Sequence, residues 1–476
     1  MEKTQNTALM FLKSALSKEG SFISVQDVLG WLKEQNERVV VNINKTKFSE
    51  LENWHYDEKN GNLRHVSGRF FSIDGIDVET NWGSVSNWQQ PIINQPEVGY
   101  LGFITQEKNG ILHFLVQAKI EPGNINKVQL SPTLQATRSN YTQVHKGKQP
   151  DYLEYFQRVK PSEVLLDQLQ SEQGARFLRK RNRNIIITVH GDIEIKPNFV
   201  WLTLGQIKRL MQFDDVVNMD SRTVISGISF GNFDSLSVNV FACLQSLEES
   251  SPIKSKMLTS ALSSDTGITK IDEVISYLTH YKSTYDLKVT KVPLKQLDKW
   301  IFSDEKIYHE DSKFFNVLPI QVEISNREVV KWCQPMIQPA QMGICAFIVK
   351  LIDNVVHFAV QVKLECGNHD IVELAPTVQC LTGNFRDSKK GQVPFLDYVI
   401  GISPEQIIYD SLQSEEGGRF YHEQNRNMIV VVGDDIPIEL PEKFIWMTLN
   451  QLYVFLKFNN YLNIQARSLL AAVSFV

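Results

Sequence analysis

Hydrophobic residues recur with helical spacing at the start of the chain and with strand spacing further along. Residues 7–16 and 25–37 carry apolar side chains at helical intervals, which predicts two amphipathic helices. By contrast, ILHFLVQAKI (111–120) and NIIITVH (184–190) alternate or run apolar, and Gly, Asn or Asp turn signals bound them. The sequence therefore predicts strands at both of these segments.

Two further segments begin as helices do. PSEVLLDQLQSEQGARFLRKR (161–181) and SPEQIIYDSLQSEEGGRF (403–420) place Pro, Ser and Glu at their starts, which is typical of helix N-termini. Strands early and late with helices between them predict an α+β fold built on a mixed or antiparallel sheet.

The same order of patterns occurs twice along the chain. HFLVQAKIEPGN (113–124) matches HFAVQVKLECGN (357–368), and QSEQGARFLRKRNRN (170–184) matches QSEEGGRFYHEQNRN (413–427). The offset between matching segments stays between 243 and 246 residues. So steady an offset indicates an internal duplication of one domain-sized unit rather than a stack of short repeats.

The predicted units are residues 1–230, expected to be the active copy, and residues 231–476, expected to be a structural or vestigial binding copy. A polar segment at their junction is the predicted boundary. The second unit is expected to begin with a helix over residues 234–247 and to contain loops at 250–255 and 263–267.

Composition limits the classes of protein to which the chain can belong. Its 476 residues are 42% hydrophobic and 22% charged, and this length favours more than one domain. The net charge of −5 gives no support for general nucleic-acid binding. The five cysteines form no CxxC pair, which predicts buried thiols in a reducing compartment. No segment has the length and apolarity of a signal peptide or membrane span, so a soluble cytoplasmic protein is expected.

Several motifs that would announce a cofactor or metal are missing from the sequence. Neither GxGxxG nor GxxxxGK[ST] occurs, which argues against Rossmann and P-loop nucleotide binding. HExxH, clustered His and Cys, and a DxDxDG loop are missing as well, so no built-in metal site is expected.

Gln117, Lys119 and Glu121 occupy alternate positions and so share one face of a predicted strand. The second copy keeps the same three residue types 244 positions later, while the positions between them vary. Such a row is either a solvated outer face or part of a site, and its retention in both copies does not separate fold from function.

Residues 131–148, SPTLQATRSNYTQVHKGK, are polar with few apolar neighbours. Arg138 suits a bidentate grip on phosphate, while Tyr141 and His145 are candidates for proton transfer. The matching segment APTVQCLTGNF (375–385) lacks the arginine, one serine and the tyrosine. The run is either a binding or reacting segment or a well-capped surface loop. Its other polar candidates are Ser131, Thr133, Gln135, Ser139 and Asn140.

A basic cluster, RFLRKRNRN (176–184), contains Arg176 and Arg181 and leads into a predicted strand. It can be a nucleic-acid patch, a phosphate clamp for a small ligand, or a solvated or ion-paired face. Trp88 could stack on a base or a sugar, although its retention as Trp332 in the second copy also fits a core position.

Many of these stretches carry a family resemblance. QAKIEPGN, QLSPTLQATRSNY, QSEQGARFLRKRNRN, FVWLTLGQI and VNMDSRTV resemble the nucleotide-diphosphate-hexose 2,3-dehydratases of deoxysugar biosynthesis, and the resemblance covers essentially the full chain. It implies two fused Nudix-like folds and a homodimer. The chain lacks the carboxylate-rich Nudix box, so metal-dependent pyrophosphate hydrolysis is not expected.

The resemblance also implies a reaction, the loss of water across C2 and C3 of dTDP-4-keto-6-deoxy-glucose to give a 3,4-diketo-2,6-dideoxy sugar nucleotide, without a cofactor. The C4 ketone acidifies the C3 hydrogen, so a base can take that proton while an acid helps the C2 hydroxyl to leave. Hydrogen-bond donors would stabilise the enolate. A 3-ketoreductase is the expected next enzyme, and no nucleic-acid or membrane partner is expected.

Site roles under this resemblance are hypotheses. Glu121, Tyr141 or His145 would transfer protons, and Lys119, Arg138 and Asn140 would stabilise the enolate or orient the sugar. Nucleotide and diphosphate would be held by Arg69, Trp88, Arg176 and Arg181. Further substrate-binding candidates are Gln117, Ser131, Thr133, Gln135 and Ser139. A Nudix-like hydrolase and a noncatalytic nucleotide-sugar-binding protein are the alternatives.

Overall fold

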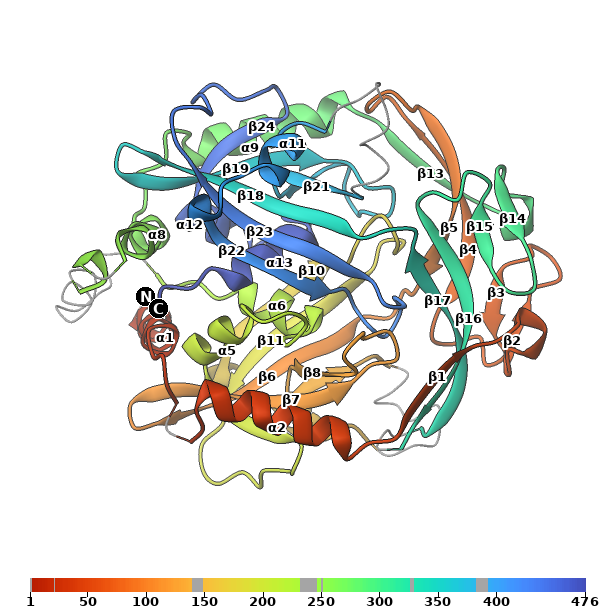
Figure 1. The fold of residues 1–476 in the computed structure, drawn as a ribbon, viewed down its shortest axis with the longest axis horizontal. Helices are drawn as coiled ribbons and strands as arrows, with labels where there is room; N and C mark the ends of the chain where they lie inside the picture. Colours follow the sequence, from red (N-terminus) through yellow and green to blue (C-terminus); the bar gives the residue numbers. More distant parts are fainter. Residues whose placement is uncertain are drawn as a thin grey trace.

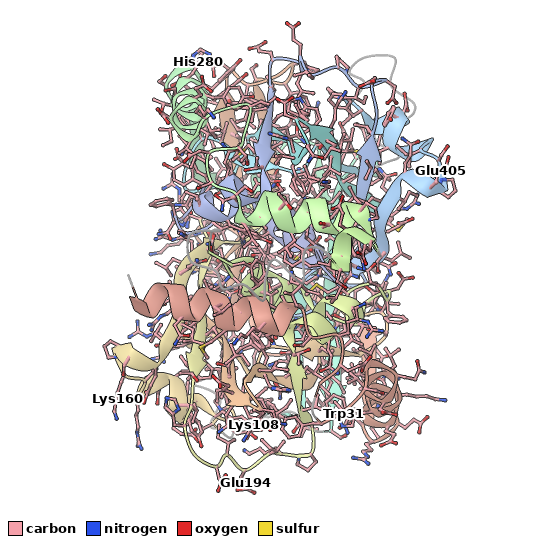
Figure 2. The ribbon with its side chains drawn as sticks, turned by 90° about the vertical axis from the view of Figure 1, so that its left-hand side faces the viewer. Trp31, Lys108, Lys160, Glu194, His280 and Glu405 are labelled. Atoms are coloured by element: carbon pink, nitrogen blue, oxygen red, sulfur yellow. The ribbon has the colours of Figure 1, made fainter. Side chains whose placement is uncertain are left out.

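A computed structural model describes residues 2–20, 22–138, 149–231, 246–249, 251–325, 329–381 and 393–476. Helices and strands follow the same order in the two halves of the chain. Residues of the first half, such as Lys108 and Glu194, lie at one end of the molecule, and His280 and Glu405 of the second half lie at the other (Figure 2).

Each half contains a seven-stranded mixed sheet. In the first half the strand order is β10-β11-β6-β7-β12, with β8 beside β7 and β9 beside β6, and only the β11–β6 pair is parallel. The bounds are β6 Gly99–Lys108, β7 Ile111–Ile120, β8 Val128–Ser131, β9 Leu134–Ala136, β10 Val164–Ser171, β11 Arg181–Thr188 and β12 Phe199–Thr203. The strands predicted at 111–120 and 184–190 are confirmed as β7 and β11.

The second half repeats this sheet as β20-β19-β18-β23-β22, with β21 beside β18 and β24 beside β19. Its bounds are β18 Gly343–Ile352, β19 Val355–Lys363, β20 Glu373–Ala375, β21 Val378–Leu381, β22 Ile407–Ser414, β23 Gln424–Val432 and β24 Phe444–Thr448. The fold is therefore mixed α+β with two similar, sheet-rich halves.

Two smaller sheets exchange strands between the halves. Strand β1 pairs antiparallel with β16, placing Ile43 opposite Val322, and β13 pairs antiparallel with β4, placing Val289 opposite Val78. Each copy thus gives one edge strand to the small sheet of the other, as the right-hand side of Figure 1 shows. The strands are β1 Val41–Lys45, β2 Trp54–Tyr56, β3 Leu63–His65, β4 Ser72–Thr80, β5 Asn87–Asn94, β13 Leu287–Val292, β14 Trp300–Phe302, β15 Ile307–His309, β16 Phe315–Ile324 and β17 Lys331–Pro339.

Helices cover the large sheets and join the halves. The helix α1 packs on β7, where Ser14 Oγ donates to the carbonyl of Leu112 at 2.6 Å, and α8 packs on β19 through the matching bond from Ser260 to Val356, also 2.6 Å. The helix bounds are α1 Glu2–Ala15, α2 Val25–Glu37, α4 Leu153–Gln157, α5 Leu204–Leu210, α6 Met219–Ser226, α8 Pro252–Leu262, α9 Ile271–Thr284, α11 Leu396–Ile400, α12 Leu449–Phe455 and α13 Ile464–Ala472.

Helices α6 and α13 pack against each other at the centre of the molecule (Figure 1). Arg222 of α6 donates to Ser468 Oγ and to the carbonyl of Ser414, both in the second half. Arg467 of α13 donates in return to the carbonyl of Ser171. Both arginines are almost fully buried, so these bonds satisfy charged groups that would otherwise be costly to bury. The two halves therefore share one continuous core.

Two predictions about local structure are wrong. At 161–181, Pro161–Glu163 forms a single 3₁₀ turn, and the chain then continues as strand β10 because Asp167 pairs with Ile185 of β11. The matching segment 403–420 becomes β22 in the same way. Tertiary pairing overrides the helix-start signal, which extends only one turn.

The start of the second half also differs from the prediction. The loop expected at 250–255 gives way to α8, because Pro252 takes a first-turn position that suits its fixed backbone angle. The loop expected at 263–267 is confirmed. Most of the helix expected at 234–247 lies outside the described residues. No helix within the described ranges is long and apolar enough to cross a membrane.

Candidate active site

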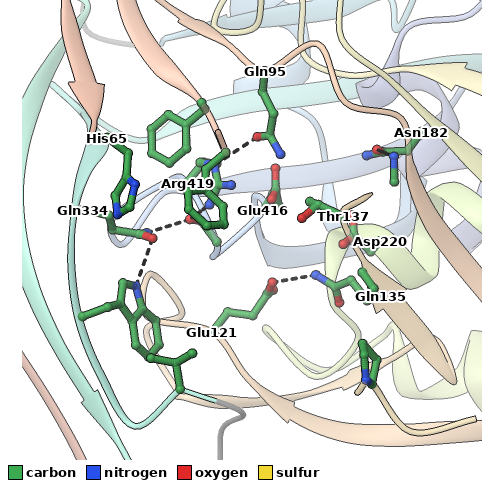
Figure 3. Close-up of a pocket in the computed structure, with 18 of the residues that line it drawn as sticks. His65, Gln95, Glu121, Gln135, Thr137, Asn182, Asp220, Gln334, Glu416 and Arg419 are labelled. Atoms are coloured by element: carbon green, nitrogen blue, oxygen red, sulfur yellow. Dashed lines mark hydrogen bonds between the residues drawn. The ribbon is translucent and has the colours of Figure 1, made fainter. Parts of the chain in front are cut away.

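A cavity of about 310 Å³ opens where the first large sheet meets both small sheets and one loop of the second half (Figure 3). Its polar lining combines four carboxyl groups, from Glu52, Glu121, Asp220 and Glu416, with cationic side chains. The residues around it include Trp54, His65, Phe70, Phe71, Gln95, Lys119, Gln135, Thr137, Lys180, Asn182, Lys331, Trp332, Gln334 and Arg419. Both copies therefore line one cavity.

The end of β7 positions Lys119 and Glu121. Gln135 of β9, the short strand beside β6, donates from its amide nitrogen to Glu121 Oε1 at 2.6 Å, and its backbone carbonyl accepts from Lys119 Nζ at 3.2 Å. The Gln135 amide oxygen in turn accepts from Ser131 Oγ at 3.0 Å and from Asn218 at 3.1 Å. These bonds fix which end of the amide faces Glu121. Gln135 therefore holds the Glu121 carboxyl group in place.

A loop of the second half is locked directly onto the end of β7. Gly123 donates from its backbone N–H to the carbonyl of Gly417 at 2.7 Å, and His422 donates to the carbonyl of Gly123 at 2.8 Å. A Cβ built on Gly123 would overlap the carbonyl oxygen of Phe420, so glycine is required there. This contact carries Glu416 and Arg419 to the cavity.

Glu416 and Asp220 differ from Glu121 in their bonding. Within the described residues no side chain or backbone group donates a hydrogen bond to either carboxyl, and both face the cavity (Figure 3). Enclosure in the protein raises the pKa of Glu416 to about 8, and the neighbouring Glu172 and Glu121 add to the rise while Arg419 opposes it. Burial, with Glu416 and Glu121 nearby, raises the pKa of Asp220 well above its usual range.

Two cations approach the carboxyl groups. Lys180 is buried and donates to the backbone carbonyl of Glu97, and burial lowers the pKa of its ammonium group. The Arg419 guanidinium lies 4.1 Å from the centre of the Phe71 ring and donates to Gln95 Oε1 at 3.1 Å. Positive charge therefore stands beside the carboxyl groups, where it can oppose negative charge that develops on a bound ligand.

Aromatic rings and amides form the opposite wall. Trp332 of β17 donates to Gln334 Oε1 at 3.1 Å, and Gln334 donates to the carbonyl of Gly418 at 2.8 Å. Trp54 donates to the carbonyl of Cys333 at 2.7 Å. The exchanged small sheets thus provide flat surfaces suited to a base or a sugar ring.

Several predicted site residues lie away from this cavity. The Arg176 guanidinium lies 4.3 Å from the centre of the Phe315 ring, on the side of the second copy. Burial lowers the pKa of His369 of that copy, and the positive charge of Arg181 adds to this effect. Trp88 packs among Ile76, Val78 and Cys366. The loop after β10 crosses to the other half, just as the loop after β22 crosses to the first half. Arg176, Arg181 and Trp88 therefore do not share a cavity with Glu121.

The remaining predictions divide into three groups. Ser131 and Thr133 are buried supports, since Thr133 bridges strands by donating to the carbonyl of Leu115 and accepting from the N–H of Ile104. Arg69, Gln117 and Arg138 are described but are not among the residues around the cavity. Ser139, Asn140, Tyr141 and His145 lie outside the described residues.

Sequence reasoning missed Asp220 and Glu416, and it noted Lys180 only as a member of the basic cluster at 176–184. Asp220, Glu416 and Lys180 correspond to Gln465, Gln173 and Glu423 in the other copy. Comparison of the copies would have marked these changes of charge. It would not have placed Glu416 beside Glu121, because that proximity depends on the crossing loop.

The arrangement related by the duplication keeps the same supporting bonds. Gln379 donates to Glu365 Oε1 at 2.9 Å, Asn463 donates to Gln379 at 2.7 Å, and Lys363 donates to the carbonyl of Gln379 at 3.2 Å. Both copies therefore hold a glutamate in the same way, while the surrounding charges differ. No group of three or more His, Cys, Asp or Glu side chains in the described part of the chain is arranged to hold a metal ion.

The carboxyl groups, cations and aromatic rings around the cavity suit a polar ligand that carries an aromatic or sugar ring. The sequence model described as NDP-hexose 2,3-dehydratase matches residues 25–228 and 271–473, one match in each half. The chain belongs to this family, and its activity makes it a carbon–oxygen lyase.

Three relatives share this class. A dTDP-4-dehydro-6-deoxy-alpha-D-glucopyranose 2,3-dehydratase of Saccharopolyspora spinosa is 44% identical over 98% of this chain and 95% of its own. Enzymes of the same name from Amycolatopsis orientalis and Streptomyces violaceoruber are 39% and 40% identical, over 97% and 93% of this chain and 92% and 95% of their own.

Proposed function

We propose that this enzyme eliminates water across C2 and C3 of dTDP-4-keto-6-deoxy-glucose, giving dTDP-3,4-diketo-2,6-dideoxy-hexose. The names of the three relatives support this substrate. The observation that carries the proposal furthest is the cavity, in which Glu121, held by Gln135, faces cations and aromatic rings.

In this reaction Glu121 acts as the base at C3. Among the described residues, Gln135 is the one that donates a hydrogen bond to the Glu121 carboxylate, which leaves acceptor capacity for the substrate proton. As the proton leaves, the electron pair forms an enolate with the C4 carbonyl. Lys119, on the same strand face, stabilises the charge on that oxygen. The C2 hydroxyl then departs as water, and the resulting enol tautomerises to the 3,4-diketone.

The wider assignments follow from the same resemblance. The repeated halves are Nudix-like units, residues 1–230 form the active copy, and residues 231–476 form a copy that supports the site. The enzyme works as a homodimer in the cytoplasm, and its reactive diketone product is consumed by a 3-ketoreductase. Sedimentation velocity of the purified enzyme tests the dimer, since a single species at the mass of one chain would contradict it.

A proton NMR time course of the purified enzyme with dTDP-4-keto-6-deoxy-glucose in deuterated water tests the function. The expected result is loss of the C3 proton signal and formation of the 3,4-diketo-2,6-dideoxy product. Release of dTMP would instead indicate a hydrolase. An unchanged spectrum with line broadening of the nucleotide would indicate a binding protein, and either outcome would overturn the proposal.

A further inference from the structure

We propose that Glu416 of the second copy is the general acid of the active site in the first copy, where it protonates the C2 hydroxyl as it leaves. This assignment rests on the proposed function. It makes the second copy a contributor of a catalytic residue rather than a support alone.

The geometry brings Glu416 next to the proposed base. A Cβ built on Gly418 would lie 3.0 Å from Glu416 Oε1 and 3.6 Å from Glu121 Oε1, so both carboxyl groups converge on one point of the backbone. Figure 3 shows the two side chains directed into the same cavity. An acid and a base placed in this way can reach adjacent carbons of one sugar ring.

The surroundings of the two carboxyl groups suit opposite roles. Glu121 accepts a hydrogen bond from Gln135, which orients its carboxyl group as an acceptor. Glu416 receives no hydrogen bond from the described residues, and Asp220, Glu121 and Glu172 surround it with acidic groups. Arg419 and Lys180 oppose this effect only in part, since the pKa of Glu416 remains raised. Glu416 therefore carries a proton near neutral pH, as a general acid must.

The duplication supplies an internal comparison. In the corresponding loop of the first copy, Gln173 takes the position of Glu416. Glutamine has the same size but cannot release a proton. The bonds that support Glu121 recur around Glu365. The shared framework therefore does not require the change from an acid, Glu416, to an amide, Gln173.

The two carboxyl groups also close the catalytic cycle. Glu121 takes the C3 proton, the C2–O bond breaks, and Glu416 gives its proton to the departing hydroxyl, which leaves as water. The enol at C3 then gives its hydroxyl proton to the Glu416 carboxylate, while Glu121 returns its proton to C2. Both groups end in their starting protonation states, and no external oxidant or reductant is needed.

The Glu416→Gln variant tests this role with two substrates. Removing a general acid lowers the rate by about 10²- to 10⁴-fold, and this loss is expected for dTDP-4-keto-6-deoxy-glucose. The analogue with fluorine in place of the C2 hydroxyl needs no proton to release fluoride. We expect Glu416→Gln to release fluoride from it at a rate within about tenfold of the wild-type enzyme.

Two controls separate a chemical role from a structural one. Gln173→Glu makes the reverse change in the corresponding loop and should leave turnover of the natural substrate unchanged. Glu416→Asp keeps a carboxyl and should recover part of the lost rate. Equal losses of Glu416→Gln on both substrates would overturn the acid role, as would full activity on the natural substrate. Wild-type turnover in the same assay shows independently that the proposed function holds.

Discussion

The two copies hold Glu121 and Glu365 by the same bonds but surround them with different charges. Around Glu121 stand Asp220, Lys180 and Glu416, whereas the corresponding positions around Glu365 are Gln465, Glu423 and Gln173. The supporting amide and the glycine contact are shared. The comparison teaches that the framework survived duplication in both halves, while the pattern of acids and cations that suits elimination is found in one.

The largest expected effect comes from changing the matched glutamates. Glu121→Gln should lower kcat for the dTDP-4-keto sugar by about 10³-fold or more, because the proposed base is lost. Glu365→Gln should change kcat less than threefold, a bound of about 0.7 kcal/mol. Steady-state kinetics of both variants measure the difference. Similar losses in the two variants would remove the distinction between the copies.

The glycines that lock the crossing loops should behave alike, because they belong to the shared framework. Cβ atoms built on Gly123 and Gly367 would overlap the carbonyl oxygens of Phe420 and Phe177. Gly123→Ala and Gly367→Ala should each lower the free energy of unfolding by about 3 kcal/mol. Urea unfolding followed by tryptophan fluorescence checks this, and a harmless Gly367→Ala would show that only one loop needs the close contact.

A smaller effect is expected at Glu423, the counterpart of Lys180. Burial raises the pKa of this carboxyl to about 8, with Glu415 adding to the rise and Arg176 opposing it. Its contribution to stability is therefore present below its ordinary pKa and is lost as the pH rises through about 8. The free energy of unfolding of Glu423→Gln should rise by about 2 kcal/mol relative to that of the wild-type protein between pH 6.5 and pH 8.5. Thermal unfolding at these two pH values measures the change, and a pH-independent difference would contradict it.

The smallest effect is expected at Asp220. Its pKa lies well above the usual range because of burial and nearby carboxyl groups, which favours its neutral form. Asp220→Asn keeps a neutral hydrogen-bonding group of similar size and should lower kcat by less than about tenfold. A loss as large as that of Glu416→Gln would instead assign the acid role to Asp220.

The sequence predicted the elements that local patterns determine. The strands β7 and β11 follow from apolar runs between turn signals, and the duplication follows from matching segments. Lys119 and Glu121 were expected to share one strand face; both line the cavity, although Glu121 lies one residue past the end of β7. Ser131 and Gln135 were expected to contact substrate, which stays a prediction; Gln135 lines the cavity, and the bonds of both residues support Glu121.

What the sequence did not predict depends on contacts between distant segments. The strand β10 resembles a helix start, and only its pairing with β11 decides otherwise. The exchange of β1 and β13 leaves no mark in a periodic pattern. From the sequence, Arg176 was grouped with the residues of its own copy. Its loop crosses to the other half, where Gly367 donates from its backbone N–H to the carbonyl of Gly174, and no local pattern reveals this contact.

The most direct test of the account is a crystal structure of the Glu416→Gln variant with dTDP-4-keto-6-deoxy-glucose bound. The account predicts the sugar in the cavity between both copies, with C3 facing Glu121 and the C2 hydroxyl within hydrogen-bond distance of residue 416. A sugar bound only beside Glu365 and Gln173, or one whose C2 hydroxyl faces away from residue 416, would contradict it.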